Sequence, residues 1–393
     1  MSEEGPQTGW SRRHFGRALG IGGAGAAVLA VGLPSAVADA DTPDFNVTPS
    51  SSATANTLAI RSAIASGYVS LAPGVYPVAR TGTEAELFLI DKAIEFDGNG
   101  AKLIVDDGTP TTVDIFHFIA NDTFPLFAIE QYGPSPTGVS VGTVGLYVHD
   151  LEVYPNTVAN WASIGRYALH IDLDAAGTNW FRNVHFERIT AGGFSDSALR
   201  VTNTTKTDGI WSSTFSQLNL YGGIRVQQGG DSLTFSDISI KAMANEIAVD
   251  IDLVPSAGTL LVESINGEGG TALMKIVLSG NSCAKVQSCN MEQYLGNASP
   301  TGALAYFQGG MDWMINDNRF LKIFPTGVPV PNTNGLQLSA ATKPTVLNNQ
   351  LQGSGTGTDL VVDSACTNTY APATSNRCFR GSYSVAGTTR AAI

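Results

Sequence analysis

Short strands that alternate apolar and polar residues recur along most of the chain. One series begins each strand with an aromatic or β-branched residue and covers 186–189, 215–218, 235–238, 262–265 and 286–289, with looser members at 315–318 and 347–350. A second series covers 168–171, 198–201, 223–226, 247–250, 272–275, 304–307, 335–338 and 359–362. Neighbouring members of a series lie mostly about 20 to 32 residues apart. This pattern is typical of a solenoid whose stacked coils have corners of different lengths.

Two other architectures fit the pattern less well. An antiparallel sandwich predicts a tight two-residue turn at each corner, but the Asn-Gly pairs at 266–267 and 334–335 do not recur from corner to corner. A leucine-rich repeat requires a regular L-x-x-L-x-L pattern, which the chain lacks. The sequence therefore predicts an all-β, single-stranded parallel β-helix.

The segment from residue 57 to residue 105 carries a more specific signal. Residues 57–65 are apolar at helical spacing, which predicts a helix that caps the open end of the solenoid. GYVSLAPGVYPV (67–78) and AIEFDGNGAKLIV (93–105) then supply a Pro-Gly-x-Tyr corner and a Gly-x-Gly-Ala turn. Here the chain resembles the pectin-lyase-like superfamily of right-handed parallel β-helices. The resemblance implies that fold and a protein that cleaves, isomerises or binds polysaccharides, but it carries no catalytic motif.

The first 40 residues have the features of an export signal. Arg12 and Arg13 precede an apolar, glycine- and alanine-rich run, and small residues follow at 36–38 and 38–40. These features predict a twin-arginine signal peptide and a secreted, extracellular bacterial protein with no stable membrane anchor. We therefore divide the chain into a signal peptide (1–40), a β-helix domain (41–365) and a C-terminal tail (366–393).

Charge and cysteine content narrow the partners further. The chain has 22 basic and 34 acidic residues, a formal net charge of −12, and no basic stretch, which argues against nucleic acid as a partner. In an exported protein, four cysteines predict two disulfides, 283–289 and 366–378 by proximity, the second stapling the tail. A zinc site is disfavoured because no histidines accompany these cysteines. The sequence leaves a monomer and a homotrimer open.

Alternation along the strands places candidate catalytic residues on the outer face. If Leu169 and Ile171 face the core, His170 faces outward. Because stacked coils lie about 4.8 Å apart, we expect His170, Arg200 and Arg225 in one outward column, with acidic residues beside it. The candidate catalytic residues are Arg200, Arg225, Lys275, Asp250, Asp252 and Asp172, and the candidate substrate-binding residues are His170, Gln227, Glu292 and Tyr294.

The basic residues of this column favour β-elimination. A lyase needs a base and a positive charge that stabilises the enolate-like anion formed beside a uronate carboxylate. Arg200, Arg225 and Lys275 can supply that charge. Ca²⁺ is a candidate cofactor, with Asp172, Asp250 or Asp252 as ligands, although the cofactor is unknown.

A pair of carboxyl groups would instead favour glycoside hydrolysis or transfer. Asp250 and Asp252 share one strand face, roughly 6.5–7 Å apart, and Asp172 and Asp174 repeat that spacing. A third hypothesis is a non-catalytic, glycan-binding β-helix, since outward charged residues often pair with their neighbours. Arg188, Asp237 and Asp317 fall at one corner column and are expected to be structural. The favoured hypothesis is a secreted polysaccharide lyase acting on a polysaccharide or oligosaccharide.

Overall fold

The structure is a computed structural model that describes residues 45–125, 139–175, 180–204, 209–227, 229–254, 258–293, 297–323, 331–387 and 389. The chain divides into two units, residues 1–44 and 45–393, and the second is described below. The predicted signal peptide and Tyr294 lie outside the described residues. Within them, no helix has the length and apolar character needed to span a membrane.

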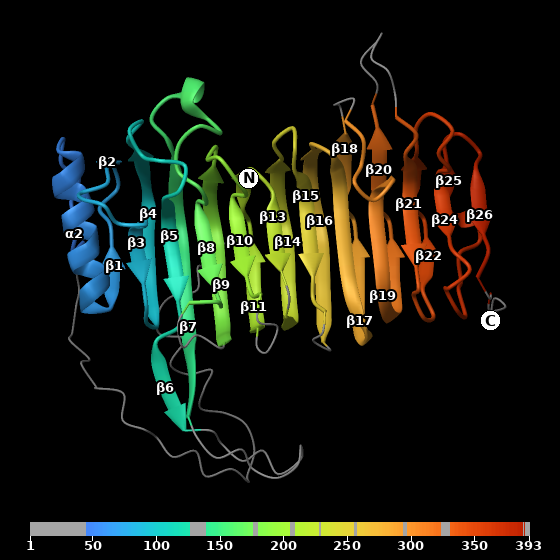
Figure 1. Ribbon diagram of the computed structural model, residues 1–393, viewed down its shortest axis with the longest axis horizontal. Helices are drawn as coiled ribbons and strands as arrows, with labels where there is room; N and C mark the ends of the chain where they lie inside the picture. Colours follow the sequence, from blue (N-terminus) through green and yellow to red (C-terminus); the bar gives the residue numbers. More distant parts are fainter. Residues whose placement is uncertain are drawn as a thin grey trace, which may run out of the picture. The chain divides into compact units, whose positions relative to one another are not determined.

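The strands form three walls of parallel strands, here called sheets A, B and C, and long strands turn a corner and contribute to two walls. Figure 1 shows the successive coils side by side. Sheet A contains β3 (Glu86–Ile90), β5 (Asp114–Ile119), β8 (Leu169–Asp172), β10 (Leu199–Thr202), β13 (Ile224–Gln227), β15 (Ile247–Asp252), the first parts of β17 (Ala272–Gln287) and β19 (Ala303–Asn316), β21 (Asn334–Ser339), β24 (Leu360–Val362) and β26 (Tyr383–Val385).

Sheets B and C complete each coil. Sheet B contains β1 (Tyr68–Ser70), β11 (Ile210–Ser216), β22 (Thr345–Leu347), the second parts of β17 and β19, and the leading portions of β4 (Ile94–Val105), β7 (Val139–Pro155), β9 (Trp180–Gly192), β14 (Gly230–Lys241) and β16 (Thr259–Gly269). Sheet C contains the final portions of those five strands with β2 (Val75–Val78), β12 (Asn219–Tyr221), β18 (Asn290–Gln293), β20 (Arg319–Lys322), β23 (Gln350–Gln352) and β25 (Arg377–Cys378).

This arrangement confirms the predicted parallel β-helix. Among the described strands, β6 (Asp122–Pro125) is the exception, because it pairs antiparallel with the start of β7. Parallel pairing continues past residue 365, where β25 pairs with β23 and β26 pairs with β24. Two short 3₁₀ helices, η2 (Val158–Asn160) and η3 (Ala373–Ser375), lie in the connections.

The predicted capping helix is confirmed as α2 (Ala53–Ser66), which covers the first coil. The side chain of Ser52 accepts a hydrogen bond from the backbone N–H of Ala55 and so caps the start of the helix. Gly67 ends it with a φ of 92°, a conformation that glycine adopts without strain. Ile60 and Ile64 are buried against the coil, so α2 shields the apolar interior that the first coil would otherwise expose.

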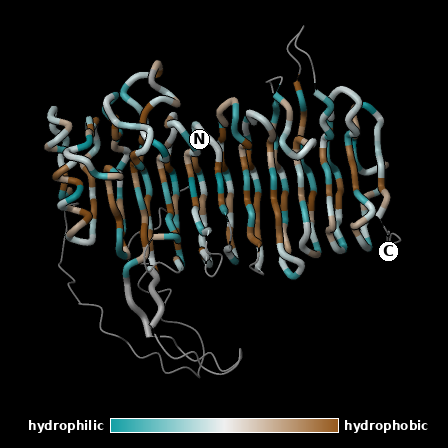
Figure 2. Tube along the Cα trace, in the orientation of Figure 1, coloured by the Kyte–Doolittle hydropathy of each residue, from teal (hydrophilic) through white to brown (hydrophobic). Residues whose placement is uncertain are grey.

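The core is built from the inward residues of successive coils. Apolar and polar positions alternate along the strands (Figure 2). Phe186, Phe215 and Phe235 are fully buried in three consecutive coils, and their ring centroids are 5.5 Å and 4.9 Å apart. The same inward position thus recurs from coil to coil, which is why the sequence shows a repeat.

A second interior row is polar. Asn318, Asn349 and Asn376 are buried at equivalent places in three consecutive coils. The Nδ2 amide of Asn318 donates to Oδ1 of Asn349, and the Nδ2 amide of Asn349 donates to Oδ1 of Asn376. Both hydrogen bonds are 3.0 Å long. Asn349 also donates to the carbonyl oxygens of Ile315 and Leu347 at 2.9 Å. This asparagine ladder satisfies corner backbone groups that would otherwise be buried without partners.

The corner between sheets B and C has a left-handed backbone in the coils that lie between the first coil and the last. The non-glycine residues there are Asn99, Asp150, Arg188, Gln217, Asp237, Ser264, Ser288, Asp317 and Asn348, with φ between 47° and 59°. The structural role predicted for Arg188, Asp237 and Asp317 is therefore confirmed, because each provides the turn that redirects the strand.

The two predicted disulfides are wrong, since all four cysteines are free thiols. Along β17, Cys283 occupies a half-exposed, outward position, whereas Cys289 is buried. They therefore lie on opposite sides of the solenoid wall. Cys366 is buried beside Asp363, ahead of a bridge to sheet B, while Cys378 lies in β25 of sheet C. Cysteines that are close in sequence can still lie far apart in a solenoid, because the chain passes from one wall to the next within each coil.

Candidate functional site

The outer face of sheet A carries a continuous column of polar side chains. The strand register aligns, one coil after another, His117, His170, Arg200, Arg225, Asp250 and Lys275. The predicted alignment of His170, Arg200 and Arg225 is confirmed. The structure also resolves the register that the sequence left open, because Asp250 and Lys275 continue the same column.

Neighbouring members of this column use a repeated diagonal contact. Each of the first three side chains contacts a residue on the next coil, two positions after the member of the column that lies directly beside it. These contacts join His117 to Asp172, His170 to Thr202 and Arg200 to Gln227. Burial alone would lower the pKa of His117, but the Asp172 hydrogen bond, and the charges of Asp114, Asp172 and Glu86, raise it. Asp172, predicted as a catalytic or calcium-binding residue, is thus the partner of a histidine.

Asp114, at the start of β5, is almost fully buried, at 1% exposure, and it fixes two basic side chains. Its carboxylate accepts hydrogen bonds from Nε and Nη2 of Arg166 at 2.7 and 2.9 Å and lies 2.7 Å from Nδ1 of His170. Burial would raise the pKa of Asp114, but the bonds from His170 and Arg166 outweigh it and keep this pKa below its usual value. An ionised Asp114 holds the Nδ1–H tautomer of His170, which leaves Nε2 as the acceptor.

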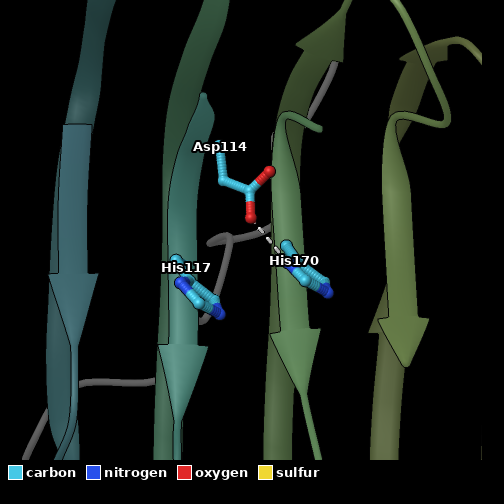
Figure 3. A group of neighbouring side chains, drawn as sticks. All are labelled: Asp114, His117 and His170. Carbon is cyan, nitrogen blue, oxygen red and sulfur yellow. Dashed lines mark hydrogen bonds and ion pairs between the residues drawn. The ribbon is translucent and has the colours of Figure 1, made fainter. Parts of the chain in front are cut away.

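The two histidines lie face to face beside this carboxylate. Figure 3 shows the parallel rings of His117 and His170 and the Asp114 carboxylate directed at His170. Their ring centroids are 4.9 Å apart and their planes differ by 4°. Asp114, His117 and His170 could together offer a metal ion three ligand atoms within 4.8 Å of one another. Two imidazoles and one carboxylate suit a transition metal better than Ca²⁺, which prefers oxygen ligands.

Tyr167 lies at the centre of the basic side chains. Its ring centroid is 4.8 Å from that of His170, and the guanidinium carbons of Arg166 and Arg200 lie 4.7 and 5.9 Å from the ring. Burial, and then the charge of Asp196, raise the pKa of the Tyr167 phenol. A tyrosine is already protonated at neutral pH with its ordinary pKa, so Tyr167 carries a phenolic proton, and the raised pKa makes it a weaker acid than a free tyrosine.

Arg200 is a buried cation with incomplete pairing. The residue is 7% exposed, and its Nη2 donates to Oε1 of Gln227. Its Nε and Nη1 atoms are buried without a hydrogen-bond partner. Burial, and then the nearby charge of Arg225, lower the pKa of the Arg200 guanidinium. Two adjacent guanidinium groups with free donors form a site suited to a carboxylate.

The next three residues of the column balance one another. Asp250 lies 3.2 Å from Nζ of Lys275 and 3.7 Å from Nε of Arg225. The other half of the predicted carboxyl pair, Asp252, accepts a hydrogen bond from the backbone of Val254 at 3.0 Å. Asp250 is therefore held between two cations, while Asp252 supports a turn, and the two carboxylates have different environments.

A second carboxyl group with a perturbed pKa lies just ahead of β15. Glu246 Oε2 accepts hydrogen bonds from the backbone of Gly223 and Met243 at 3.0 and 2.9 Å. Burial nevertheless raises the pKa of Glu246, and the charge of Asp196 raises it further. Asp196 also interacts with the Arg200 charge, so the charge of Asp196 acts on both Glu246 and Arg200.

The sequence did not identify Asp114, Arg166, Tyr167, Asp196 or Glu246. All precede or begin sheet A strands, at positions that the repeat alignment did not include. Extending the alignment two residues upstream would have placed Arg166 beside Asp196, whose backbone N–H donates to the Arg166 carbonyl at 3.0 Å.

Glu292, a predicted binding residue, belongs to a different wall. It lies in β18 of sheet C, pairs with Arg319 and borders a shallow depression of about 350 Å³ that Lys241 and Glu268 also line. The structure therefore does not bring Glu292 together with the sheet A residues.

Comparisons with known proteins give architecture alone. No protein-family model matches the chain, and no curated protein matches it. Tailspike protein 3 of bacteriophage CBA120 matches with 14% identity and a TM-score of 0.37, over 83% of this chain and 50% of its own. The Dettilon tailspike protein matches with 13% identity and a TM-score of 0.39, over 86% and 61%.

A third solved structure is covered more completely. The A-module of the mannuronan C-5 epimerase AlgE4 of Azotobacter vinelandii matches with 11% identity and a TM-score of 0.33, over 86% of this chain and 94% of its own. By contrast, this chain spans only about half the length of the CBA120 tailspike and about three fifths of the length of the Dettilon tailspike. At these identities and TM-scores the matches indicate nothing about activity.

Proposed function

We propose that this protein is a polysaccharide lyase that cleaves a uronate-containing glycan on the outer face of sheet A. The observation that carries the proposal is the buried Arg200 guanidinium, whose Nε and Nη1 lack hydrogen-bond partners beside a second guanidinium, Arg225. A buried cation with free donors is costly unless an anion binds it. A uronate carboxylate is the anion that a polysaccharide-active enzyme would meet.

The neighbouring side chains provide the other parts of a β-elimination. Arg200 and Arg225 would hold the substrate carboxylate and stabilise the negative charge that develops on it. Nε2 of His170, once the substrate displaces the Thr202 hydroxyl that it contacts, would remove the proton on the carbon next to that carboxylate, with Asp114 keeping the imidazole oriented. The Tyr167 phenol, which like any tyrosine is protonated at neutral pH, would give a proton to the departing glycosidic oxygen. The C–O bond breaks as a C=C double bond forms, so one proton is taken up and one is released.

A second candidate function is glycoside hydrolysis. It is favoured by Glu246, whose raised pKa lets it act as an acid, together with Asp196, whose charge contributes to that shift. An acid and an ionised carboxylate are the pair that a glycosidase requires. This assignment replaces the Asp250 and Asp252 pair, since Asp250 is held between two cations.

The test is incubation of the purified protein with uronate-containing and neutral glycans, with and without a metal chelator. Ultraviolet absorbance from unsaturated uronide ends is expected, and Tyr167→Phe and His170→Gln should each lower the rate at least about 100-fold. His185→Gln, on the outer face of sheet B, is the matched control and should leave the rate unchanged. Reducing ends without that absorbance, lost in Glu246→Gln, would establish hydrolysis instead. Binding of a glycan without products would establish a non-catalytic binding protein.

We also propose that the protein is exported. The paired arginines, apolar run and small-residue sites of residues 1–40 support this proposal. Expression in a bacterium with and without a functional twin-arginine translocase tests it, and unchanged export in the mutant strain would contradict that route.

A further inference from the structure

A second group of titratable side chains lies on sheet B and its corner with sheet C, away from the sheet A column. We define the His149 cluster as Glu95, Asp97, His149, Asp150, Glu187 and Arg188. The strand register places Asp97, His149 and Glu187 at one outward position in three consecutive coils. Asp150 is the corner residue that follows His149, and its φ of 56° turns the chain there.

The imidazole of His149 is surrounded by carboxylate oxygens. Its Nδ1 lies 2.7 Å from Oδ2 of Asp150 and 3.6 Å from Oδ1 of Asp97. Its Nε2 lies 3.7 Å from Oε1 of Glu95, beyond hydrogen-bond distance. The ligand atoms of Asp97, His149 and Asp150 all lie within 4.8 Å of one another.

Charge and burial distinguish this cluster from an ordinary surface ion pair. The cluster holds four carboxylates and one guanidinium, that of Arg188, which binds Asp150 at 2.7 and 2.9 Å and also contacts Glu187. His149 is 7% exposed, and its Nε2 is buried without a hydrogen-bond partner. The cluster therefore has an excess of negative charge around a buried nitrogen ligand, and a further cation would balance it.

We propose that the His149 cluster binds one first-row divalent metal ion, Zn²⁺ or Mn²⁺, through Nδ1 of His149 and carboxylate oxygens of Asp97 and Asp150. An imidazole combined with carboxylates suits these ions, whereas Ca²⁺ prefers an all-oxygen set. Bonds of about 2.1 Å place the ligand atoms of a tetrahedral site about 3.4 Å apart, close to the 3.6 Å between Nδ1 of His149 and Asp97. The 2.7 Å contact between Nδ1 and Asp150 is a hydrogen bond, which the ion would replace by taking the place of the Nδ1 proton.

The surrounding residues would hold the ligands in place. With a metal on Nδ1, the Nε2–H of His149 would face Glu95, the carboxylate contact that commonly orients a ligating histidine. The Tyr147 ring stacks on His149 at 4.3 Å, and its hydroxyl donates to Glu187 at 2.8 Å. The competing account is a protonated His149 that balances the acids by itself, and it predicts no metal binding.

Metal content of the full chain tests the proposal. After loading with Zn²⁺, Mn²⁺ or Ca²⁺ and dialysis, elemental analysis should find one equivalent of Zn²⁺ or Mn²⁺, and Co²⁺ should give the visible absorption of a nitrogen- and oxygen-ligated ion. Asp97→Asn should weaken binding at least about 100-fold. It retains the Oδ1 acceptor that binds the backbone of Asn99 at 3.0 Å, so the fold should be preserved, and His149→Gln provides a second variant.

The matched control is Asp172→Asn. Asp172 likewise pairs with a histidine and accepts a backbone hydrogen bond two residues on, at 2.8 Å, but it lies on sheet A. It should retain the full equivalent of metal. The proposal is overturned if the wild-type protein retains no equivalent, if it prefers Ca²⁺, or if Asp97→Asn binds as well as wild type. Loss of the ion in Asp172→Asn but not in Asp97→Asn would place it on sheet A.

Discussion

Replacement of Arg200 by methionine should stabilise the protein while abolishing its activity. Arg200 has two buried nitrogen positions without hydrogen-bond partners, and relieving them should contribute about 3 kcal/mol. The variant loses the charged hydrogen bond to Gln227, worth about 2 kcal/mol. Methionine can fill the volume of the arginine stem. The expected net effect is a stabilisation of about 1 kcal/mol, since burial and Arg225 already disfavour the charge, as the lowered pKa of Arg200 indicates.

The assay combines a thermal scan with the glycan panel. A gain of about 1 kcal/mol raises the midpoint by about 1–2 °C in a chain of this size, and loss of the carboxylate contact should reduce the cleavage rate at least about 100-fold. Arg188→Met is the matched control. The Arg188 guanidinium pairs with Asp150 through two hydrogen bonds, so this variant should be destabilised by about 1 kcal/mol. A lower midpoint for Arg200→Met, together with undiminished activity, would refute the role given to this buried cation.

Two further predictions concern the fold. Asn349→Ala removes the central amide of the asparagine ladder and should lower the free energy of unfolding, measured in urea, by about 3–5 kcal/mol. Asn290→Ala, at an exposed position, should change it by less than about 0.5 kcal/mol. Similar losses in both variants would contradict the role of the ladder. Because the pKa of His117 is raised in the folded protein, its stabilisation of the fold is complete below about pH 6.5 and is lost as the pH rises through the raised pKa. Because the pKa of Asp172 is lowered, its stabilisation is complete above about pH 4 and is lost as the pH falls through the lowered pKa. Asp172→Asn should therefore lessen the fall of the thermal midpoint above pH 6.5, and an unchanged pH profile would count against the pair.

The repeat was readable from the sequence because burial imposes the same inward residue on each coil. Phe186, Phe215 and Phe235 occupy that position, and the alternation on either side of such residues gave the outward column of His170, Arg200 and Arg225. Strand parity predicts which side a residue faces, and this part of the site was accessible for that reason.

The remaining site residues were hidden by irregular connections. His117 and His170 occupy neighbouring coils, yet 53 positions separate them, because β6, the start of β7 and the η2 connection lie between. The repeat alignment began after that insertion and so missed Asp114 and its partner Arg166. Parity also cannot show what a carboxylate binds, and Asp252 shares the outward parity of Asp250 but supports a turn.

At the corner between sheets B and C the fold requires a particular backbone conformation but not a particular side chain. Each corner residue must adopt a left-handed φ near 50°, but its side chain extends from the outer edge of the coil, where acids, amides, hydroxyls and a guanidinium are all accommodated. Asp150 and Arg188 show that such positions can carry reactive groups into register with one another. Substitutions at successive corners could therefore place chosen ligand side chains in a line at a regular spacing of about 4.8 Å, which would allow linear binding sites to be designed along this edge.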